Sequence, residues 1–285
     1  MPAAWDGRVW IGAGCAYFIG EAGDSSPHAH HLVQVVVGLA GDVSIEDANG
    51  DRCVAPGVVV PANAPHRIVG DRTGLDSDCL MIFAESFSSL GKRFSERRGE
   101  SSACIASVDE AAAAEIREIV RSGRCHGSAL VDEIVAVLSS ENWRVRPMDR
   151  RIALAIDRIE RNFDDDDLFE RIADTLGISI RYLRKVFERE TGMTMQRFRL
   201  WARMKKAIDQ ALSGCTLTQA SMVAGFSDAA HFSRTFRDLF GVSPSMVFDK
   251  LPRSSDGASP RGEQVRFSAA KQPHERSLKR RAMTA

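Results

Sequence analysis

The chain has 285 residues, with 44% hydrophobic and 27% charged residues and a formal net charge of zero at pH 7. This length is enough for two domains that each bury a core, and the composition is typical of a globular protein. The sequence has no apolar run long enough for a membrane span and no secretory signal at its start, so we expect a cytoplasmic protein with no membrane partner. Six cysteines without C-x-x-C spacing favour free thiols.

The net charge of zero hides an asymmetry between two halves. Residues 1–147 carry 13 Lys+Arg and 20 Asp+Glu, a net of −7, whereas residues 148–285 carry 25 and 18, a net of +7. An acidic half joined to a basic half is typical of a regulatory domain attached to a domain that meets a polyanion.

The first part of the chain is rich in predicted strands. Up to about residue 85, the runs "LVQVVVG", "CVAPGVVVPA" and "CLMIFAE" are separated by Gly, Pro, Asn and Asp. This spacing predicts an antiparallel sandwich or barrel. The segment "PHAHHLVQ" places three histidines at the start of one strand, which raises the question of a metal site.

Helical patterns begin after about residue 107. Ser107 and Glu110 have the spacing of a capping box, and two apolar stripes at helical spacing follow within residues 109–142. These two amphipathic helices either cover the sheet or pair with the same helices of a second subunit, and one stripe fits both uses equally well. A further helix is predicted over residues 148–163, and residues 251–285 are expected to form a disordered basic tail.

An internal repeat is the strongest signal in the sequence. "IADTLGISIRYLRKVFERETG", residues 172–192, aligns with "ASMVAGFSDAAHFSRTFRDLFG", residues 220–241, at an offset of 48 that becomes 49 after one inserted residue. The two segments are copies of one supersecondary unit.

Each copy has the pattern of a helix-turn-helix. In the first copy, Gly177 suits the left-handed position at a helix end, Ile178 fills the corner and Ser179 suits the N-cap of the next helix. The second helix of each copy buries apolar residues and exposes others. The exposed positions are Arg181, Arg184 and Lys185 in the first copy, and Ala230, Ser233 and Arg234 in the second.

A long helix is predicted between the copies, over residues 194–212, with Phe198, Trp201, Met204 and Ile208 on one face. Its length is roughly 27 Å. This length suits two recognition helices that enter successive major grooves, roughly 34 Å apart, on one side of a DNA duplex.

Residues 148–250 resemble the DNA-binding domain of AraC/XylS-type bacterial transcriptional regulators. The runs "ISIRYLRKVFERETGMT" and "GFSDAAHFSRTFRDLFGVSPS" carry the resemblance. It implies a seven-helix domain that positions RNA polymerase at promoters, usually as an activator. Carried over by position, it implies that the DNA contacts come from Ser179, Arg181, Arg184, Lys185, Ser227, Ala230, His231, Ser233 and Arg234.

The second motif departs from this family's pattern. Ala230 stands where many relatives have a longer polar residue, so we expect the first motif to carry more of the sequence specificity. His231, which aligns with Tyr182, is expected to pack or to lie beside phosphate rather than to read a base. The acidic run over residues 164–167 precedes a helix whose N-terminus favours acids, so no metal is assigned to it.

The histidines of the first part resemble the two motifs of cupin barrels. His28, His30 and Gln34 occupy first-motif positions, and His66 occupies a second-motif position. In metal-bearing cupins the position of Gln34 holds a glutamate. A carboxamide cannot neutralise the charge of an ion, so we expect these four residues to line an effector pocket, with no metal or other cofactor.

The sequence therefore predicts a multidomain protein, β plus all-α. We expect a cupin-like effector or sensor domain at 1–95, a helical dimerisation or covering segment at 96–147, an all-α double helix-turn-helix domain at 148–250 and the tail. The expected function is a homodimeric, effector-controlled activator that binds promoter DNA and RNA polymerase and is not an enzyme. Three alternatives remain, namely a metal-dependent cupin enzyme fused to a DNA-binding domain, a metal sensor of the same build, and a regulator controlled by a partner protein.

Overall fold

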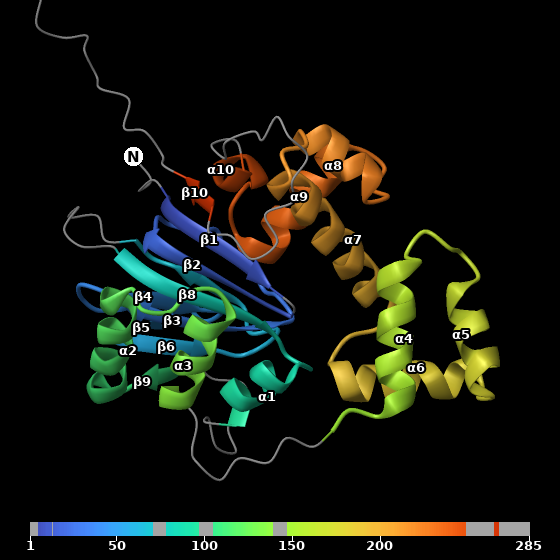
Figure 1. Cartoon of the computed structure of the whole chain (residues 1–285), viewed down its shortest axis with the longest axis horizontal. Helices are drawn as coiled ribbons and strands as arrows, with labels where there is room; N and C mark the ends of the chain where they lie inside the picture. Colours follow the sequence, from blue (N-terminus) through green and yellow to red (C-terminus); the bar gives the residue numbers. More distant parts are fainter. Residues whose placement is uncertain are drawn as a thin grey trace, which may run out of the picture.

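The computed structural model describes residues 5–12, 14–70, 78–96, 105–138, 147–248 and 265–267. A β-rich part comes first in the chain and a helical part follows (Figure 1). The strands are β1 (Asp6–Gly12), β2 (Cys15–Glu21), β3 (Leu32–Gly38), β4 (Val43–Asp47), β5 (Arg52–Ala55), β6 (Gly57–Val60), β7 (His66–Ile68), β8 (Asp78–Glu85), β9 (Ala106–Val108) and β10 (Val265–Phe267). The helices are α1 (Ser89–Glu96), α2 (Glu110–Ser122), α3 (Ser128–Leu138), α4 (Arg150–Arg161), α5 (Leu168–Leu176), α6 (Ile180–Thr191), α7 (Met195–Leu212), α8 (Leu217–Val223), α9 (Ala229–Phe240) and α10 (Pro244–Phe248).

The strands form two antiparallel sheets. The larger sheet has the order β10-β1-β2-β8-β3-β6-β9, and the smaller one has the order β5-β4-β7. The three predicted strand runs are confirmed as β3, β5 with β6, and β8. The β-rich part, which the sequence predicts as a sandwich or cupin-like barrel, consists of two sheets, and in the part of the chain that the structure describes no strand pairing closes them into a ring. Pro56 lies between β5 of the smaller sheet and β6 of the larger sheet. A proline cannot donate a ladder hydrogen bond, so it suits the point where the chain changes sheets.

The larger sheet is the middle layer of the β-rich part. Strand β3 is buried along its whole length. Val33, Val35 and Val37 belong to the core cluster on the side of α2 and α3, whereas Val36 belongs to the cluster that faces the smaller sheet. This alternation follows from the opposite directions of successive side chains in a strand. It sends Gln34 to the same side of β3 as Val36.

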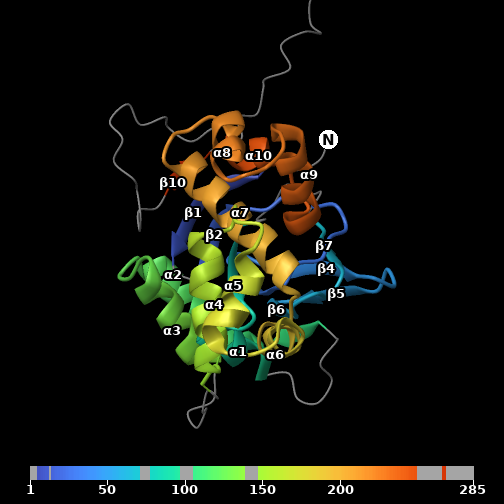
Figure 2. The ribbon, with the colours of Figure 1, turned by 90° about the vertical axis from the view of Figure 1, so that its right-hand side faces the viewer.

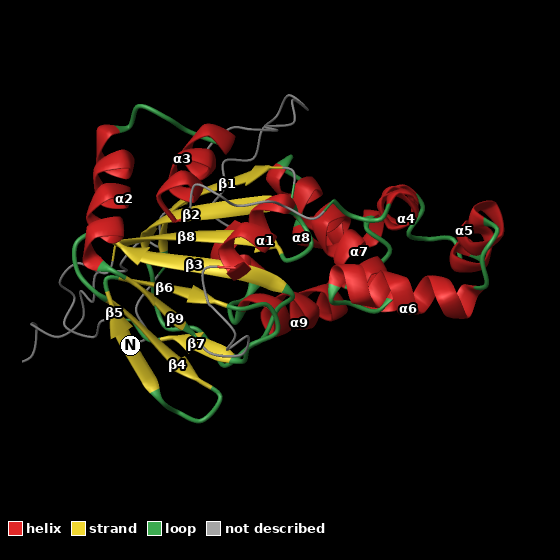
Figure 3. Cartoon of the chain, turned by 90° about the horizontal axis from the view of Figure 1, so that it is seen from below, coloured by secondary structure: helices red, strands yellow, loops and turns green. Residues whose placement is uncertain are grey.

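Helices α2 and α3 lie along one face of the larger sheet (Figure 3). Their apolar stripe, which includes Ile116, Leu130 and Ile134, is buried against that sheet within one chain. The stripe therefore covers the sheet and is not available to a second subunit. The predicted capping box is wrong. Ser107 belongs to β9, and Asp109 caps α2 by accepting a hydrogen bond from the backbone N–H of Ala112 at 2.9 Å.

Replacing Ile134 by alanine is expected to lower the free energy of unfolding by about 3 kcal/mol, because a fully buried side chain leaves a cavity in the core. Urea titration followed by circular dichroism measures this loss. If α3 covers its own sheet, the loss is the same at low and high protein concentration. A loss that grows on dilution would indicate that the stripe lies in a dimer interface instead.

The helical part consists of α4 to α10. Helix α7 runs between α8 and α9 at one of its ends and α5 and α6 at the other (Figure 2). Its buried residues Phe198, Trp201, Met204 and Ile208 hold this part together, and the same core cluster includes Leu32 from β3. The two predicted helix-turn-helix units and the long helix between them are confirmed.

The C-terminal tail, residues 251–285, lies outside the described residues except for β10. Val265 to Phe267 pair with β1 in antiparallel register, so these three residues form an edge strand and the prediction of disorder is wrong for them.

Candidate DNA-binding interface and interdomain cavity

The first motif consists of α5 and α6. Helix α5 ends at Gly177, whose φ of 63° lies in the left-handed region that glycine tolerates without strain. Ser179 then caps α6 and accepts a hydrogen bond from the backbone N–H of Tyr182 at 3.3 Å. Leu183, Val186 and Phe187 are buried, whereas Arg181, Arg184 and Lys185 are exposed on the opposite face. Helix α6 thus presents a basic surface near its N-terminus.

The side chain of Arg184 is 57% exposed and lies 3.7 Å from a carboxylate oxygen of Glu170 on α5. Exposed ion pairs of this kind contribute little to stability, so the guanidinium can turn towards another acceptor at small cost.

The second motif consists of α8 and α9. Phe232 and Phe236 are buried, Ala230 and Arg234 are exposed, and Ser233 is half-buried. The Ser233 hydroxyl donates a hydrogen bond to the carbonyl of Ala229 at 2.8 Å, inside its own helix.

The cap of α9 is Asp228, which accepts a hydrogen bond from the backbone N–H of His231 at 2.6 Å. Ser179, the cap of α6, aligns with Ser227 at an offset of 48, but Asp228 lies at an offset of 49. The residue inserted in the second copy therefore places the cap of α9 one position after Ser227. The ring of His231 contacts Phe226, with 5.3 Å between centroids, and its Nδ1 lies 3.2 Å from the Ser227 hydroxyl. These contacts hold His231 and Ser227 at the turn between α8 and α9.

The acidic run before α5 makes ion pairs with arginines. Asp166 lies 3.3 Å from Arg199 and Asp164 lies 3.6 Å from Arg203, and both arginines belong to α7. The run therefore attaches the first motif to the long helix.

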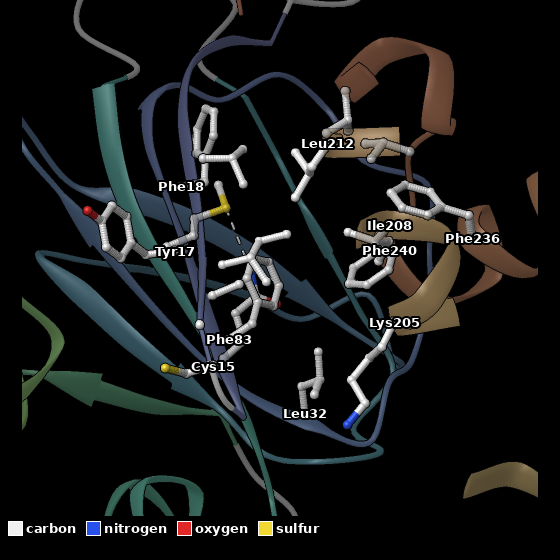
Figure 4. A pocket seen from close by; sticks show the side chains of 18 of the residues that line it. Cys15, Tyr17, Phe18, Leu32, Phe83, Lys205, Ile208, Leu212, Phe236 and Phe240 are labelled. Carbon is white, nitrogen blue, oxygen red and sulfur yellow. Dashed lines mark hydrogen bonds between the residues drawn. The ribbon is translucent and has the colours of Figure 1, made fainter. Parts of the chain in front are cut away.

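An interdomain cavity of about 340 Å³ lies between the larger sheet and the helical part. Figure 4 shows Phe18 and Phe83 on the strand side and Ile208, Leu212 and Phe240 on the helix side. Most of the lining is aromatic or aliphatic, which suits a small and mainly apolar molecule. Of the four residues predicted to line an effector pocket, His28 and Gln34 border this cavity, whereas His30 and His66 are not among its lining residues.

A polar cluster at the cavity wall joins the two parts of the chain. Glu85, at the end of β8, accepts a hydrogen bond of 2.8 Å from the Trp201 indole N–H and one of 2.7 Å from the Lys205 ammonium group. Lys205 also contacts Glu160 on α4. Burial opposes the charge of Lys205, but Glu85 and Glu160 together raise its pKa above the usual value.

Two further contacts join the parts. The ring of His31 packs edge-on against Trp201, with 4.5 Å between centroids. Ser26 donates from both its backbone N–H and its hydroxyl to the carbonyl of Gly241, at 3.0 and 2.8 Å. The β-rich part is therefore docked on α7 and on the end of α9.

Local sequence patterns do not predict this docking surface. One signal was available, because Glu85 is a carboxylate at the end of the otherwise apolar run "CLMIFAE". A buried carboxylate needs a partner. The sequence alone does not show that the partner lies 116 residues away, on the long helix.

The predicted histidines do come together. His28, His30 and His66 are buried, and their potential ligand atoms all lie within 4.8 Å of one another. Burial lowers the pKa of His30 to about 4 and that of His66 to about 3, and it also lowers the pKa of His28. All three rings are therefore neutral at pH 7. Gln34 lies among them, with its Oε1 at 3.1 Å from His30 Nε2 and 2.9 Å from His66 Nε2.

Comparison with known proteins agrees with this geometry. Residues 172–250 match the family model described as a helix-turn-helix domain. The HTH-type transcriptional activator RhaS of Escherichia coli is 34% identical over 95 residues, which are 33% of this chain and 34% of that protein. The chain thus aligns with about a third of the length of these curated relatives.

One solved structure extends the likeness to the fold of most of the chain. The crystal structure of an apo ToxT variant from Vibrio cholerae is 13% identical, with a TM-score of 0.54, and the match covers 84% of this chain and 98% of that one. A probable AraC family transcriptional regulator from Rhodopseudomonas palustris is 30% identical, with a TM-score of 0.32 over 35% of this chain and 96% of that chain. The chain has the overall fold of ToxT, a β-rich part followed by a helical part.

The matched residues 172–250 include both helix-turn-helix repeats. These residues form a helix-turn-helix domain, as the two motifs predicted. In the part of the chain that the structure describes, no helix has both the length and the apolar character needed to cross a membrane.

Proposed function

We propose that this chain is a sequence-specific DNA-binding transcriptional regulator. The observation that carries the proposal is the pair of helix-turn-helix motifs at the two ends of α7, each with a second helix that exposes arginine. Helix α7 has 18 residues. It is thus roughly 27 Å long, which suits recognition helices that enter successive major grooves on one face of the duplex.

Base recognition is assigned mainly to α6. Arg181, Arg184 and Lys185 carry donors that match the O6 and N7 acceptors of guanine, the commonest specific contact in the major groove. On α9, Ala230 has no polar group and the Ser233 hydroxyl is bonded to its own helix, so Arg234 is the main candidate there.

Phosphate contacts are assigned to the N-termini of α6 and α9. Helix N-termini attract phosphate through their backbone N–H groups. Ser179 and Ser227 lie at these ends, and His231 supports the second end by packing on Phe226.

The interdomain cavity is the proposed effector site. Its lining favours a small, mainly apolar molecule, and it includes residues of both the sheet and α7. An effector shifts the protein between two arrangements only if it binds them unequally. Binding between the sheet and α7 meets this condition, because any change in their docking changes the cavity itself.

The remaining parts of the proposal follow the RhaS relative, a transcriptional activator. The chain acts in the cytoplasm as an activator that contacts promoter DNA and RNA polymerase, and it is not an enzyme. Residues 1–95 serve as the effector domain and residues 148–250 bind DNA, in a homodimer whose interface lies outside the buried stripe of α2 and α3. Control by a partner protein is the alternative, and a cavity that binds no small molecule would favour it.

Selection of binding sequences from a pool of random DNA duplexes tests the proposal. We expect the full-length protein to enrich one sequence, and the logarithm of its affinity to fall with the logarithm of salt concentration by about 0.9 for each phosphate neutralised. A matched scrambled duplex serves as the control. Equal binding to the enriched and scrambled duplexes at physiological salt would contradict the proposal.

A further inference from the structure

One oxygen of a buried carboxylate at the interdomain cavity has no hydrogen-bond donor. Glu85 is 7% exposed, and its Oε1 accepts both the bond from the Trp201 indole and the bond from the Lys205 ammonium group. Among the residues that the structure describes, no group donates a hydrogen bond to Oε2 of Glu85. A buried carboxylate oxygen is unfavourable without a donor, so a bound molecule that supplies a donor would be stabilised at this atom.

The open oxygen lies at the wall of the cavity, because Glu85 and Gly14 both line it. A Cβ atom on residue 14 would lie 3.3 Å from Oε2, and glycine has no such atom. The φ of Gly14 is 73°, in the left-handed region that glycine tolerates without strain. The missing side chain leaves this side of Oε2 accessible to a molecule in the cavity.

The charges around Glu85 favour a cationic molecule over an anionic one. Lys205 is the one lysine or arginine among the described residues that line the cavity, and its ammonium group already contacts both Glu85 and Glu160. One ammonium group between two carboxylates leaves a net charge of −1. The lining histidine, His28, adds no positive charge at pH 7, because burial lowers its pKa. An anion would therefore meet a negative cluster, whereas a cation would neutralise it.

The thiol of Cys15, which also lines the cavity, has surroundings of the same sign. Burial raises the pKa of this thiol to about 11, and the carboxylates of Asp132 and Glu85 contribute to the rise. Groups that oppose a thiolate at this wall also oppose a ligand carboxylate and favour a ligand cation.

The rest of the cavity is apolar and extends away from this cluster. Figure 4 shows Lys205 and Leu32 at one end of the view and Phe18 and Leu212 at the other. The walls are mostly aromatic and aliphatic, and the faces of aromatic rings also attract cations. The cavity therefore suits a molecule with a charged group at one end and an apolar body.

We propose that the interdomain cavity binds an apolar primary amine, whose ammonium group donates a hydrogen bond to Oε2 of Glu85 and whose body packs between Phe18 and Leu212. The inference rests on the proposed function, in which this cavity is the effector site. A primary amine is favoured over a quaternary ammonium ion, because the open acceptor needs an N–H donor.

Isothermal titration calorimetry of the full chain, without DNA, tests the proposal with three probes that share one apolar body. These probes are phenylbutylamine, phenylbutanol and phenylbutyrate. We expect the amine to bind about tenfold or more tightly than the alcohol, because a hydrogen bond to a charged group is stronger than a neutral one. Phenylbutyrate should bind more weakly than the alcohol, since its carboxylate meets the negative cluster.

Glu85→Gln keeps the size of the side chain and removes its charge. This variant should weaken binding of the amine by about tenfold and binding of the alcohol by less than about threefold. The retained affinity for the alcohol reports that the cavity persists in the variant. Glu46→Gln is the matched control, because Glu46 lies in the smaller sheet and does not line the cavity. It should leave all three affinities unchanged.

Three results would overturn the proposal. In the unchanged protein, phenylbutyrate or phenylbutanol that binds as tightly as the amine would overturn the cationic ligand and would leave the cavity as the effector site. An amine-to-alcohol affinity ratio that Glu85→Gln does not alter would show that Glu85 is not the acceptor. Absence of binding by all three probes would overturn the amine site together with the effector role of the cavity, and the proposed binding of DNA would still stand.

Discussion

Arg184→Ala is expected to weaken binding to the selected DNA sequence by about 5- to 150-fold, since a bidentate contact between arginine and guanine contributes about 1–3 kcal/mol. Ser233→Ala, at the corresponding position of the second motif, is expected to weaken binding less than about threefold, a difference under 1 kcal/mol. The reason for the contrast is structural. Arg184 is exposed and pairs with Glu170 at a long 3.7 Å, whereas the Ser233 hydroxyl is already bonded to Ala229.

Fluorescence anisotropy with the selected duplex at one fixed salt concentration measures both losses. Arg189→Ala provides the matched control, because Arg189 is exposed in the last turn of α6, away from the end to which we assign base recognition, and it pairs with the neighbouring Glu190. Circular dichroism checks that each variant keeps its helices. Equal losses for Arg184→Ala and Ser233→Ala would show that the first motif does not carry more of the specificity.

Glu85→Ala is expected to loosen the docking of the β-rich part on α7. The change leaves the Trp201 indole N–H without its acceptor and removes one of the two carboxylates that compensate Lys205. Loss of a charged hydrogen-bond partner in a buried site costs about 2 kcal/mol. A cost of this size corresponds to about 30-fold more frequent opening of the interface.

Hydrogen–deuterium exchange of β8 and α7, followed by mass spectrometry, measures this opening. Glu46→Ala is the control, because Glu46 also forms an ion pair, with Arg67, but within the smaller sheet and partly exposed. We expect faster exchange in α7 for Glu85→Ala and no change there for Glu46→Ala. The same exchange rates in Glu85→Ala and the unchanged protein would mean that other contacts hold the two parts together.

Prediction from sequence succeeded where the determinants are local. The two helix-turn-helix motifs depend on short signals, such as the left-handed Gly177, the cap at Ser179 and the spacing of Leu183 and Phe187, and each of these acts within a few residues. The repeat then identified the second copy. Only the cap of α9 differed, because the inserted residue gives that position to Asp228.

Predictions from the sequence were incomplete or wrong where contacts between distant segments determine the local structure. Ser107 and Glu110 have the spacing of a capping box, but pairing with β6 holds Ser107 in a strand. Strand periodicity does not specify which sheet edges meet, so the sequence did not decide between an open sandwich and a closed barrel. The cavity was expected inside the β-rich part, whereas the structure forms it with Lys205 and Phe240 of the helical part, and no local pattern indicates that contact.

A hydroxyl-radical footprint of the full-length protein on its selected duplex tests the central claim most directly. Two recognition helices at the ends of α7 predict two protected segments per bound chain, about 10 base pairs apart on one face of the DNA. Arg184→Ala should remove or weaken one segment while the other persists. A single short protected segment per chain, or uniform protection along any duplex, would contradict the claim that both motifs read DNA.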